Sequence, residues 1–422
     1  MKKKILLSAF ACDPVTGSEP YVGWNWALML ADDYDVHVLT RSYSRALIDG
    51  HSEANKLTFH FADYFGTSQY NHQWRFIKLY YVIWQALVVF KVISLQARHS
   101  FALIHHVTYN NIDVPGFLWL VPRTRFVWGP VGGGQVAPRS LAKVYGKRWW
   151  KERVRGVLKA SARYNPIIRG AVNRASIVLL ANQETADRMA GLRFRSKLIS
   201  ETAISLNGLA DHPDAPRREG PVRVLWLGYV FARKGLVLAV EGFKRALESY
   251  PGLPDIELVV AGDGEGLEIA RELAERIGVA DRISFLGAIP HSEVRRHLRE
   301  ADLFLFTSVQ DTSGNVLLEA MREAKPIIAL NHQGAKALVT GGGARLVEIG
   351  SYSDTVRGIG SAIVELAGDP VLRQTMGRAN LREVRERHTW TAKRTQILEI
   401  YRHVISGSRT GTHLSARSAE FA

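Results

Sequence analysis

The chain has 422 residues, of which 46% are hydrophobic, and it carries a formal net charge of +15 at pH 7. This hydrophobic content excludes a wholly disordered chain, and the length predicts two or three domains. The single cysteine, Cys12, excludes an internal disulfide and fits a reducing compartment.

Strand and helix patterns alternate through the first half of the chain. The first strand is expected over Lys4–Ala9 rather than a cleaved signal sequence, because the apolar run is short and Phe10 is bulky for a cleavage site. Strands that alternate with helices favour a parallel sheet covered on both faces. The further elements expected here are strands 35–40, 57–61, 102–107, 126–128, 177–180 and 197–199, and helices 22–31 and 74–96.

One apolar run, Leu79–Phe90, lies between Lys78 and Lys91. Its 12 residues fall short of the roughly 20 that a membrane-spanning helix needs. We therefore expect no segment that spans a bilayer. The run predicts a core helix, or a core helix that also dips into a membrane interface.

The positive charge is concentrated between Arg139 and Arg174, where eleven Lys or Arg residues accompany one acid, Glu152. Apolar residues at near-helical spacing interleave with these bases, among them Trp149 and Trp150. Such a segment could bind nucleic acid or an anionic membrane, or be a solvated basic helix. The tryptophans among bases favour the membrane surface.

A polar, proline-rich stretch, Asp211–Pro221, predicts a linker, after which the strand–helix rhythm restarts. We expect one domain over residues 1–210, a second over 221–385, a final helix over 386–405, and a disordered tail over 406–422 rich in Ser, Thr, Gly and Arg. The fold class is thus α/β, with two Rossmann-like domains.

Glycine turns follow successive strands of the second half. Gly228 comes after one strand and Arg233-Lys234 opens the next helix, where two cations could neutralise a diphosphate. Each turn alone could be a plain strand–helix connection, but turns at the carboxyl ends of several strands together indicate a ligand site. The other turns hold Gly262 and Gly264, then Leu286 and Gly287.

The most informative stretch runs from Asp311 to Glu319, between a buried strand that ends at Ser308 and another strand over 326–330. It places two carboxylates around a glycine turn and a helix start. Carboxylates there can bind sugar and ribose hydroxyls, and the backbone N–H groups of the helix start can bind phosphate. The turn and helix start are formed by Ser313, Gly314, Asn315 and Val316.

The pattern from Gly228 to Pro326 resembles the donor domain of family 4 retaining glycosyltransferases, and the resemblance extends over roughly residues 4–404. It implies the GT-B architecture, with an N-terminal acceptor domain, a C-terminal nucleotide-sugar domain and a last helix that crosses back to the first domain. It also implies that Asp311 contacts the donor sugar and Glu319 the ribose. Two positions depart from the family: Asp311 replaces a glutamate, and Tyr229 stands at the usual phosphate-binding arginine, for which Arg233 could compensate.

The first half fits the same resemblance. The loop that holds Gly17 and Ser18 is similar to the glycine loop that approaches donor phosphates in members of polysaccharide assembly. His105 and His106 end a strand, and the family has a catalytic histidine near this point that contacts the sugar. The sequence does not decide which of the two corresponds.

The predicted activity is therefore a hexosyl transfer with retention, from GDP-mannose or a UDP-sugar to a saccharide acceptor, in polysaccharide biosynthesis. The basic segment predicts a lipid-linked acceptor and a peripheral place at the inner face of a bacterial membrane. No cofactor is expected, and no metal, because no Cys/His cluster has metal-binding spacing. The alternatives are a nucleotide-sugar epimerase of the same architecture, which needs no acceptor, and a noncatalytic basic nucleic-acid-binding protein.

Overall fold

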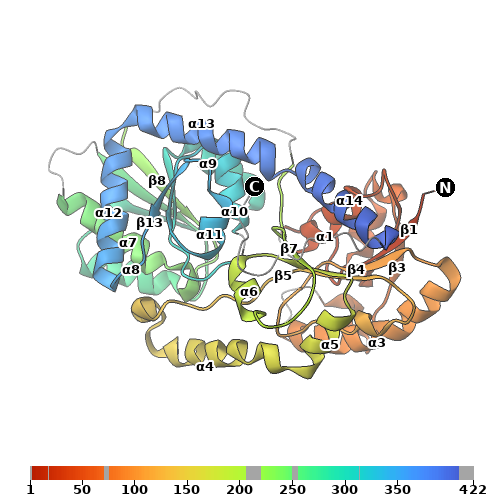
Figure 1. The fold of residues 1–422 in the computed structure, drawn as a ribbon. Helices are drawn as coiled ribbons and strands as arrows, with labels where there is room; N and C mark the ends of the chain where they lie inside the picture. The colour runs from red at the N-terminus through yellow and green to blue at the C-terminus, as the bar shows by residue number, and fades with distance from the viewer. Residues whose placement is uncertain are drawn as a thin grey trace. The chain divides into compact units, whose positions relative to one another are not determined.

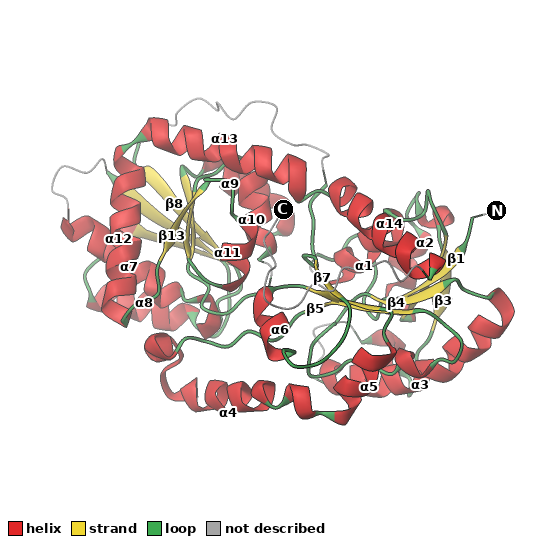
Figure 2. Cartoon of the chain, in the orientation of Figure 1, coloured by secondary structure: helices red, strands yellow, loops and turns green. Residues whose placement is uncertain are grey.

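Helices and parallel strands alternate along the chain (Figure 2). The computed structural model describes residues 2–17, 19–70, 76–205, 220–249, 255–312 and 314–407. Its internal contacts divide it into two units. Unit 1 comprises residues 1–134, 157–203 and 390–422, and unit 2 comprises residues 135–156 and 204–389.

Unit 1 is built on a seven-stranded parallel sheet with the order β3-β2-β1-β4-β5-β6-β7. Strand β1 is an interior strand and pairs with β2 on one side and β4 on the other. The strands are β1 (Lys4–Ser8), β2 (Asp35–Thr40), β3 (Thr58–Phe61), β4 (Leu103–His106), β5 (Phe126–Val131), β6 (Ile177–Leu180) and β7 (Ser196–Leu198).

Helices cover both faces of this sheet. On β1, Ile5 and Leu7 join a core that includes Trp26 and Tyr401, while Leu6 joins the opposite core with Trp84. This alternation is the period-2 pattern of a strand buried on both faces. The helices are α1 (Glu19–Leu28), α2 (Arg45–Asp49), α3 (Ile77–His99), α5 (Pro166–Arg174), α6 (Gln183–Arg188) and α14 (Trp390–Ser406).

Helix α3 has 23 residues, longer than its central apolar run. By length and composition it is the one helix, among the described residues, that could cross a membrane. A core helix passes the same test, and one side of α3, with Tyr81, Trp84 and Val88, is buried in unit 1. Its other side exposes Leu79 and Phe90.

Unit 2 contains a six-stranded parallel sheet with the order β10-β9-β8-β11-β12-β13 (Figure 1). Its strands are β8 (Val222–Leu227), β9 (Ile256–Ala261), β10 (Ile283–Gly287), β11 (Leu303–Phe306), β12 (Ile327–Leu330) and β13 (Ala344–Val347). Its helices are α7 (Leu236–Ser249), α8 (Leu267–Arg276), α9 (His291–Glu300), α10 (Asn315–Arg322), α11 (Gln333–Leu338), α12 (Tyr352–Gly368) and α13 (Pro370–Arg387).

The strand at the centre of this sheet again divides two cores. Val224 and Trp226 of β8 pack with α7 and α12, whereas Leu225 and Leu227 pack with Leu317 and other residues of the opposite face. Both sheets are therefore doubly wound α/β layers, and the predicted fold class, two Rossmann-like domains, is confirmed.

The division by contacts differs from the predicted boundaries by a few residues near 204 and 390, and by a whole segment earlier in the chain. Residues 135–156, which precede the last strands of unit 1 in sequence, belong to unit 2. Leu141 and Tyr145, in the 3₁₀ segment Arg139–Arg148, lie in the core of unit 2 with Phe243. Helix α4 (Trp149–Ala160) follows this segment. Residues 206–219 of the predicted linker and 408–422 of the predicted tail lie outside the described residues.

Candidate functional site

Three glycine turns at the carboxyl edge of the unit 2 sheet are held together by backbone hydrogen bonds. The Gly228 N–H donates to the Ala261 carbonyl at 3.1 Å, and the Gly262 N–H donates to the Gly287 carbonyl at 2.8 Å. A Cβ atom on Gly262 would lie 1.9 Å from the Gly228 carbonyl oxygen. Only glycine permits this approach, at a φ of +149°, and the turns predicted from the sequence thus form one surface.

The loop that opens α7 is fixed against the end of β11. Gly235 has a φ of +67°, and a Cβ there would lie 2.3 Å from the Thr307 carbonyl oxygen. The Thr307 hydroxyl donates to the Gly235 carbonyl at 2.8 Å, and the Val309 N–H donates to the Arg233 carbonyl at 2.8 Å. These contacts bring Arg233 and Lys234 beside the chain that leads to Asp311.

Lys234 and Asp311 form an ion pair in this loop, with only 16% and 14% of their side chains exposed. Burial lowers the pKa of the Lys234 ammonium, and the Asp311 carboxylate opposes that effect. The Ser308 hydroxyl donates to the same carboxylate at 3.3 Å, and the Thr312 N–H donates to its other oxygen at 3.0 Å. Lys234, which the sequence assigned to phosphate, and Asp311, which it assigned to the sugar, are therefore in contact.

Helix α10 begins after Gly314, whose φ is +59°, with Asn315 and Val316 in its first turn. Glu319 lies one turn further on, with 19% of its side chain exposed, and His291 Nε2 is 3.5 Å from its carboxylate. This contact raises the pKa of His291. Ser313 and Ser18, both predicted to bind the donor, lie outside the described residues.

Glutamine side chains that the sequence analysis missed connect the Asp311 loop to residues 135–136. The Gln310 amide donates to the Gln135 carbonyl at 2.9 Å, and the Gln333 amide donates to the Val136 carbonyl at 2.9 Å. The Asp311 N–H donates to the Gln333 side chain at 3.0 Å. No motif marks these glutamines, because their role depends on the docking of residues 135–156 on unit 2.

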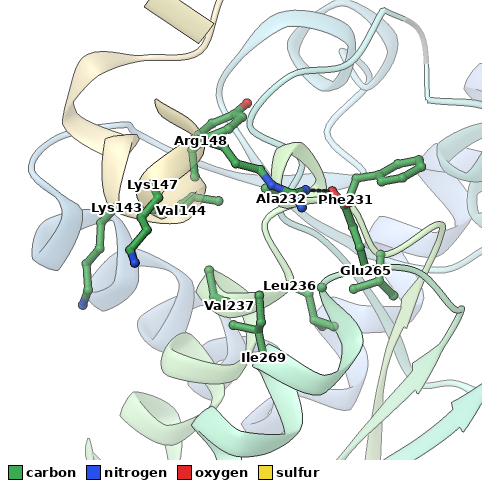
Figure 3. A pocket seen from close by; sticks show the side chains of 14 residues that line it. Lys143, Val144, Lys147, Arg148, Phe231, Ala232, Leu236, Val237, Glu265 and Ile269 are labelled. Carbon is green, nitrogen blue, oxygen red and sulfur yellow. Dashed lines mark hydrogen bonds and ion pairs between the residues drawn. The ribbon is translucent and has the colours of Figure 1, made fainter. Parts of the chain in front are cut away.

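A cavity of about 330 Å³ lies within unit 2, next to the loop that holds Arg233 (Figure 3). Arg148 and Glu265 form an ion pair across its mouth. Phe231 and Ala232 on its wall directly precede Arg233, but the residues that line it include none of those predicted to bind the donor. The remaining lining residues are Lys143, Val144, Tyr145, Gly146, Lys147, Val230, Leu236, Val237, Gly266 and Ile269.

In unit 1, His105 is fully buried under α14. Its Nδ1 is 2.6 Å from the Tyr401 hydroxyl, and its Nε2 is 2.7 Å from the Gly129 carbonyl oxygen. Burial lowers its pKa to about 3, so the ring is neutral. Because both nitrogens are bonded to protein atoms, this geometry does not favour the predicted catalytic role of His105.

His106 points to the opposite face of β4, as successive strand residues do. Its Nε2 is 2.8 Å from the Tyr81 hydroxyl, and burial lowers its pKa to about 4. Glu19 lies nearby: it accepts from the Tyr109 N–H at 3.3 Å, and burial raises the pKa of its carboxyl. Its Nδ1 is 3.4 Å from the Ser8 hydroxyl, so both nitrogens of His106, like those of His105, are bonded to protein groups, and the sugar contact of either histidine stays a prediction.

The loop that contains Gly17 is shaped by Asp13, whose Oδ1 accepts from the Val15 and Thr16 N–H groups at 3.0 and 2.6 Å. Behind it, a Cβ on Gly23 would lie 2.3 Å from the Ala11 carbonyl oxygen, so α1 approaches this loop closely. The sequence predicted the loop but not the buried Arg41, which lies 5.0 Å over the Phe10 ring.

Solved structures of other proteins share this fold. Solved structures with a similar fold include sucrose-phosphate synthase from Thermosynechococcus elongatus (TM-score 0.67, 18% identity, 96% of this chain and 100% of that one). They also include the Anabaena protein HepE in complex with UDP (TM-score 0.61, 17% identity, 94% of this chain and 99% of that one). The fold is that of GT-B glycosyltransferases.

The sequence match is more specific. Residues 210–380, most of unit 2, match the family model described as glycosyl transferases group 1. The relatives include glycogen synthase from Mycobacterium tuberculosis (26% identity, 50% of each chain). Another is a GDP-mannose-dependent phosphatidylinositol monomannoside mannosyltransferase from Mycolicibacterium smegmatis (26% identity, 58% of this chain and 66% of that one). The chain thus spans about half the length of the glycogen synthase that it matches.

Proposed function

We propose that this protein is a retaining glycosyltransferase that uses a nucleoside diphosphate sugar as donor. The observation that carries the proposal is the Lys234–Asp311 ion pair beside the joined glycine turns of unit 2. This edge offers a cation for a diphosphate, carboxylates for hydroxyl groups, and turns without side chains that leave room for a ligand.

The ribose, the diphosphate and the sugar of the donor would lie along this edge, each beside its own residues. Glu319 would accept hydrogen bonds from the ribose, Lys234 and Arg233 would face the diphosphate, and Asp311 would hold the sugar. The Arg233 guanidinium donates to the Gln310 carbonyl at 3.2 Å, which keeps it beside Lys234. Arg233 is therefore the residue of this loop that could replace the missing family arginine at Tyr229.

In the reaction, the bond between the anomeric carbon and the diphosphate oxygen breaks, and the acceptor hydroxyl oxygen bonds to that carbon on the same face. The hydroxyl proton passes to the departing diphosphate. Negative charge grows on the diphosphate in the transition state, where Lys234 and Arg233 would stabilise it electrostatically.

The donor is GDP-mannose or a UDP-sugar. One relative is named as GDP-mannose-dependent, and one protein of similar fold was solved with UDP. The acceptor is a lipid-linked saccharide of polysaccharide biosynthesis. This choice is supported by α4, whose exposed Trp150, Val154, Val157 and Leu158 lie at the spacing of one helical face among bases. The protein would then act at the inner face of a bacterial membrane.

A donor screen tests the proposal. The purified protein is incubated with GDP-mannose and several UDP-sugars, each with and without a bacterial lipid extract, and free nucleotide and labelled lipid are measured. Release that depends on the lipid, with label transferred to it, supports the transferase. Conversion of one nucleotide sugar into another without release would instead identify an epimerase, and no turnover of any donor would contradict catalysis.

A further inference from the structure

Three histidines of unit 1 that have no part in the predicted sugar chemistry meet in space. His37 lies on β2, His60 on the neighbouring β3, and His99 is the last residue of α3. Ring nitrogens of the three, one from each, all lie within 4.8 Å of one another. Their spacing of 23 and 39 residues matches no metal motif, so no metal was expected from the sequence.

The ring geometry is close to that of a three-histidine metal centre. His37 Nδ1 is 2.8 Å from His60 Nε2, and the two rings stack with centroids 5.1 Å apart. The His99 ring lies 4.7 Å from the His37 ring. Zinc–nitrogen bonds of about 2.0–2.1 Å in a tetrahedral site place ligand nitrogens about 3.3 Å apart. This separation lies between the shortest and the longest spacing in the cluster, so small side-chain rotations would admit an ion.

Groups next to the rings hold them in orientations that suit metal binding. The Asp35 carboxylate is 3.6 Å from His37 Nε2, which favours a proton on that nitrogen and leaves the Nδ1 lone pair facing His60. The buried Phe101 ring lies 5.0 Å from His37 and 5.5 Å from His99 and restricts both.

Charged groups of both signs lie around the cluster. Asp35 provides negative charge beside the cluster, while Lys4 and Lys91 are the cations that face it.

We propose that His37, His60 and His99 bind one divalent ion of the zinc type, with water at the fourth position. Imidazole nitrogens suit Zn²⁺, Co²⁺, Ni²⁺ and Cu²⁺. The ion would link β2 and β3, at one edge of the unit 1 sheet, to the end of α3. It would therefore stabilise this unit without taking part in sugar transfer.

The test uses the full chain without a polyhistidine tag, treated with a chelator and then titrated with Co²⁺ and Zn²⁺. We expect about one ion per chain, Co²⁺ visible bands typical of a four-coordinate site that Zn²⁺ removes, and a higher unfolding temperature with Zn²⁺. His60→Ala and His99→Ala should each weaken binding by more than about tenfold. His403→Ala, an exposed histidine of α14, is the matched control and should bind as the unchanged protein does.

Three results would overturn the proposal: no bound ion at micromolar Zn²⁺, binding that survives both substitutions, or an equal loss in His403→Ala. Because His60 is partly buried, circular dichroism must show that each variant folds. His99→Gln, at the more accessible end of α3, is the second variant if His60→Ala does not fold.

Discussion

The Lys234 ammonium is paired with the Asp311 carboxylate, which also accepts hydrogen bonds from the Ser308 hydroxyl and the Thr312 N–H. A diphosphate would compete with Asp311 for Lys234, and a sugar hydroxyl would compete with Lys234 for Asp311. The pair therefore keeps two buried charges neutralised until a donor that satisfies both arrives.

Lys234→Ala should lower kcat with the accepted donor by about 10²–10³-fold, because a cation beside the leaving diphosphate is lost. Lys234→Arg should recover part of the rate, since it keeps the charge. Lys244→Ala is the control, on a lysine of α7 that pairs with Glu248 at 3.0 Å. Initial rates of nucleotide release measure all three, and a Lys234→Ala rate within threefold of the unchanged protein would remove Lys234 from the mechanism.

Gly262→Ala should reduce the free energy of unfolding by about 2–4 kcal/mol and weaken donor binding, because its Cβ would collide with the Gly228 carbonyl. Gly278 is a matched control: it also has a positive φ, +74°, but a Cβ there meets no atom within 4 Å. Gly278→Ala should cost only about 1 kcal/mol. Urea unfolding and nucleotide titration compare the two, and equal losses would show that the contact between the turns is unimportant.

Donor affinity should fall as the pH drops through the pKa of His291. Its contact with Glu319 raises that pKa above the ordinary value of about 6.5, so the charged pair forms at low pH and is lost as the pH rises. Protonated His291 then competes with the ribose for Glu319. His291→Ala should flatten the dependence of the donor KM on pH between about 6 and 8. An unchanged pH profile in this variant would contradict the assignment of Glu319 to the ribose.

The candidate residues of unit 2 could be picked out from the sequence because they lie directly after strands. Gly228, Gly262 and Asp311 each follow an apolar run, and parallel strands bring their carboxyl ends to one edge. The sequence did not predict those roles that depend on contacts between distant segments. Gln135 and Tyr145 join unit 2 only through tertiary packing, and His105 shows its buried partners only once α14 is in place. The histidine cluster was not predicted either, because His37, His60 and His99 lie far apart in the sequence.

Lys393 should make the stability of unit 1 depend on pH. Its ammonium donates to the Ser200 carbonyl and lies 5.4 Å over the Trp26 ring, and burial lowers its pKa to about 7. Between pH 7 and its ordinary value of about 10.5, the unfolded chain binds the proton and the folded chain does not. Stability should therefore rise with pH across this window, by a few kcal/mol at most.

Lys393→Met has no titratable group at this position. The urea midpoint of this variant should therefore rise less between pH 7 and 9 than that of the unchanged protein. Lys197→Met, at a lysine with 38% of its side chain exposed, is the control and should keep the full slope. Parallel slopes for all three proteins would mean that Lys393 is protonated in the same way in the folded and unfolded states.

Helix α4 should bind anionic vesicles through its exposed apolar face and its bases. Trp150 is 61% exposed and Val157 is 70% exposed, one on each side of Val154 along the same face. Each nearby Lys or Arg contributes about 1 kcal/mol at an anionic surface, and this contribution falls with salt. The protein should therefore sediment with vesicles that contain phosphatidylglycerol at low salt and be released at high salt.

Replacing Trp150 and Val157 together by serine should weaken that binding by at least about tenfold, because the apolar part of the face is lost. Val371→Ser, at an equally exposed valine of α13, controls for the loss of apolar surface elsewhere. Equal binding to neutral vesicles, or unchanged binding in the double variant, would mean that α4 does not direct this protein to a membrane, and the acceptor would then be sought among soluble saccharides.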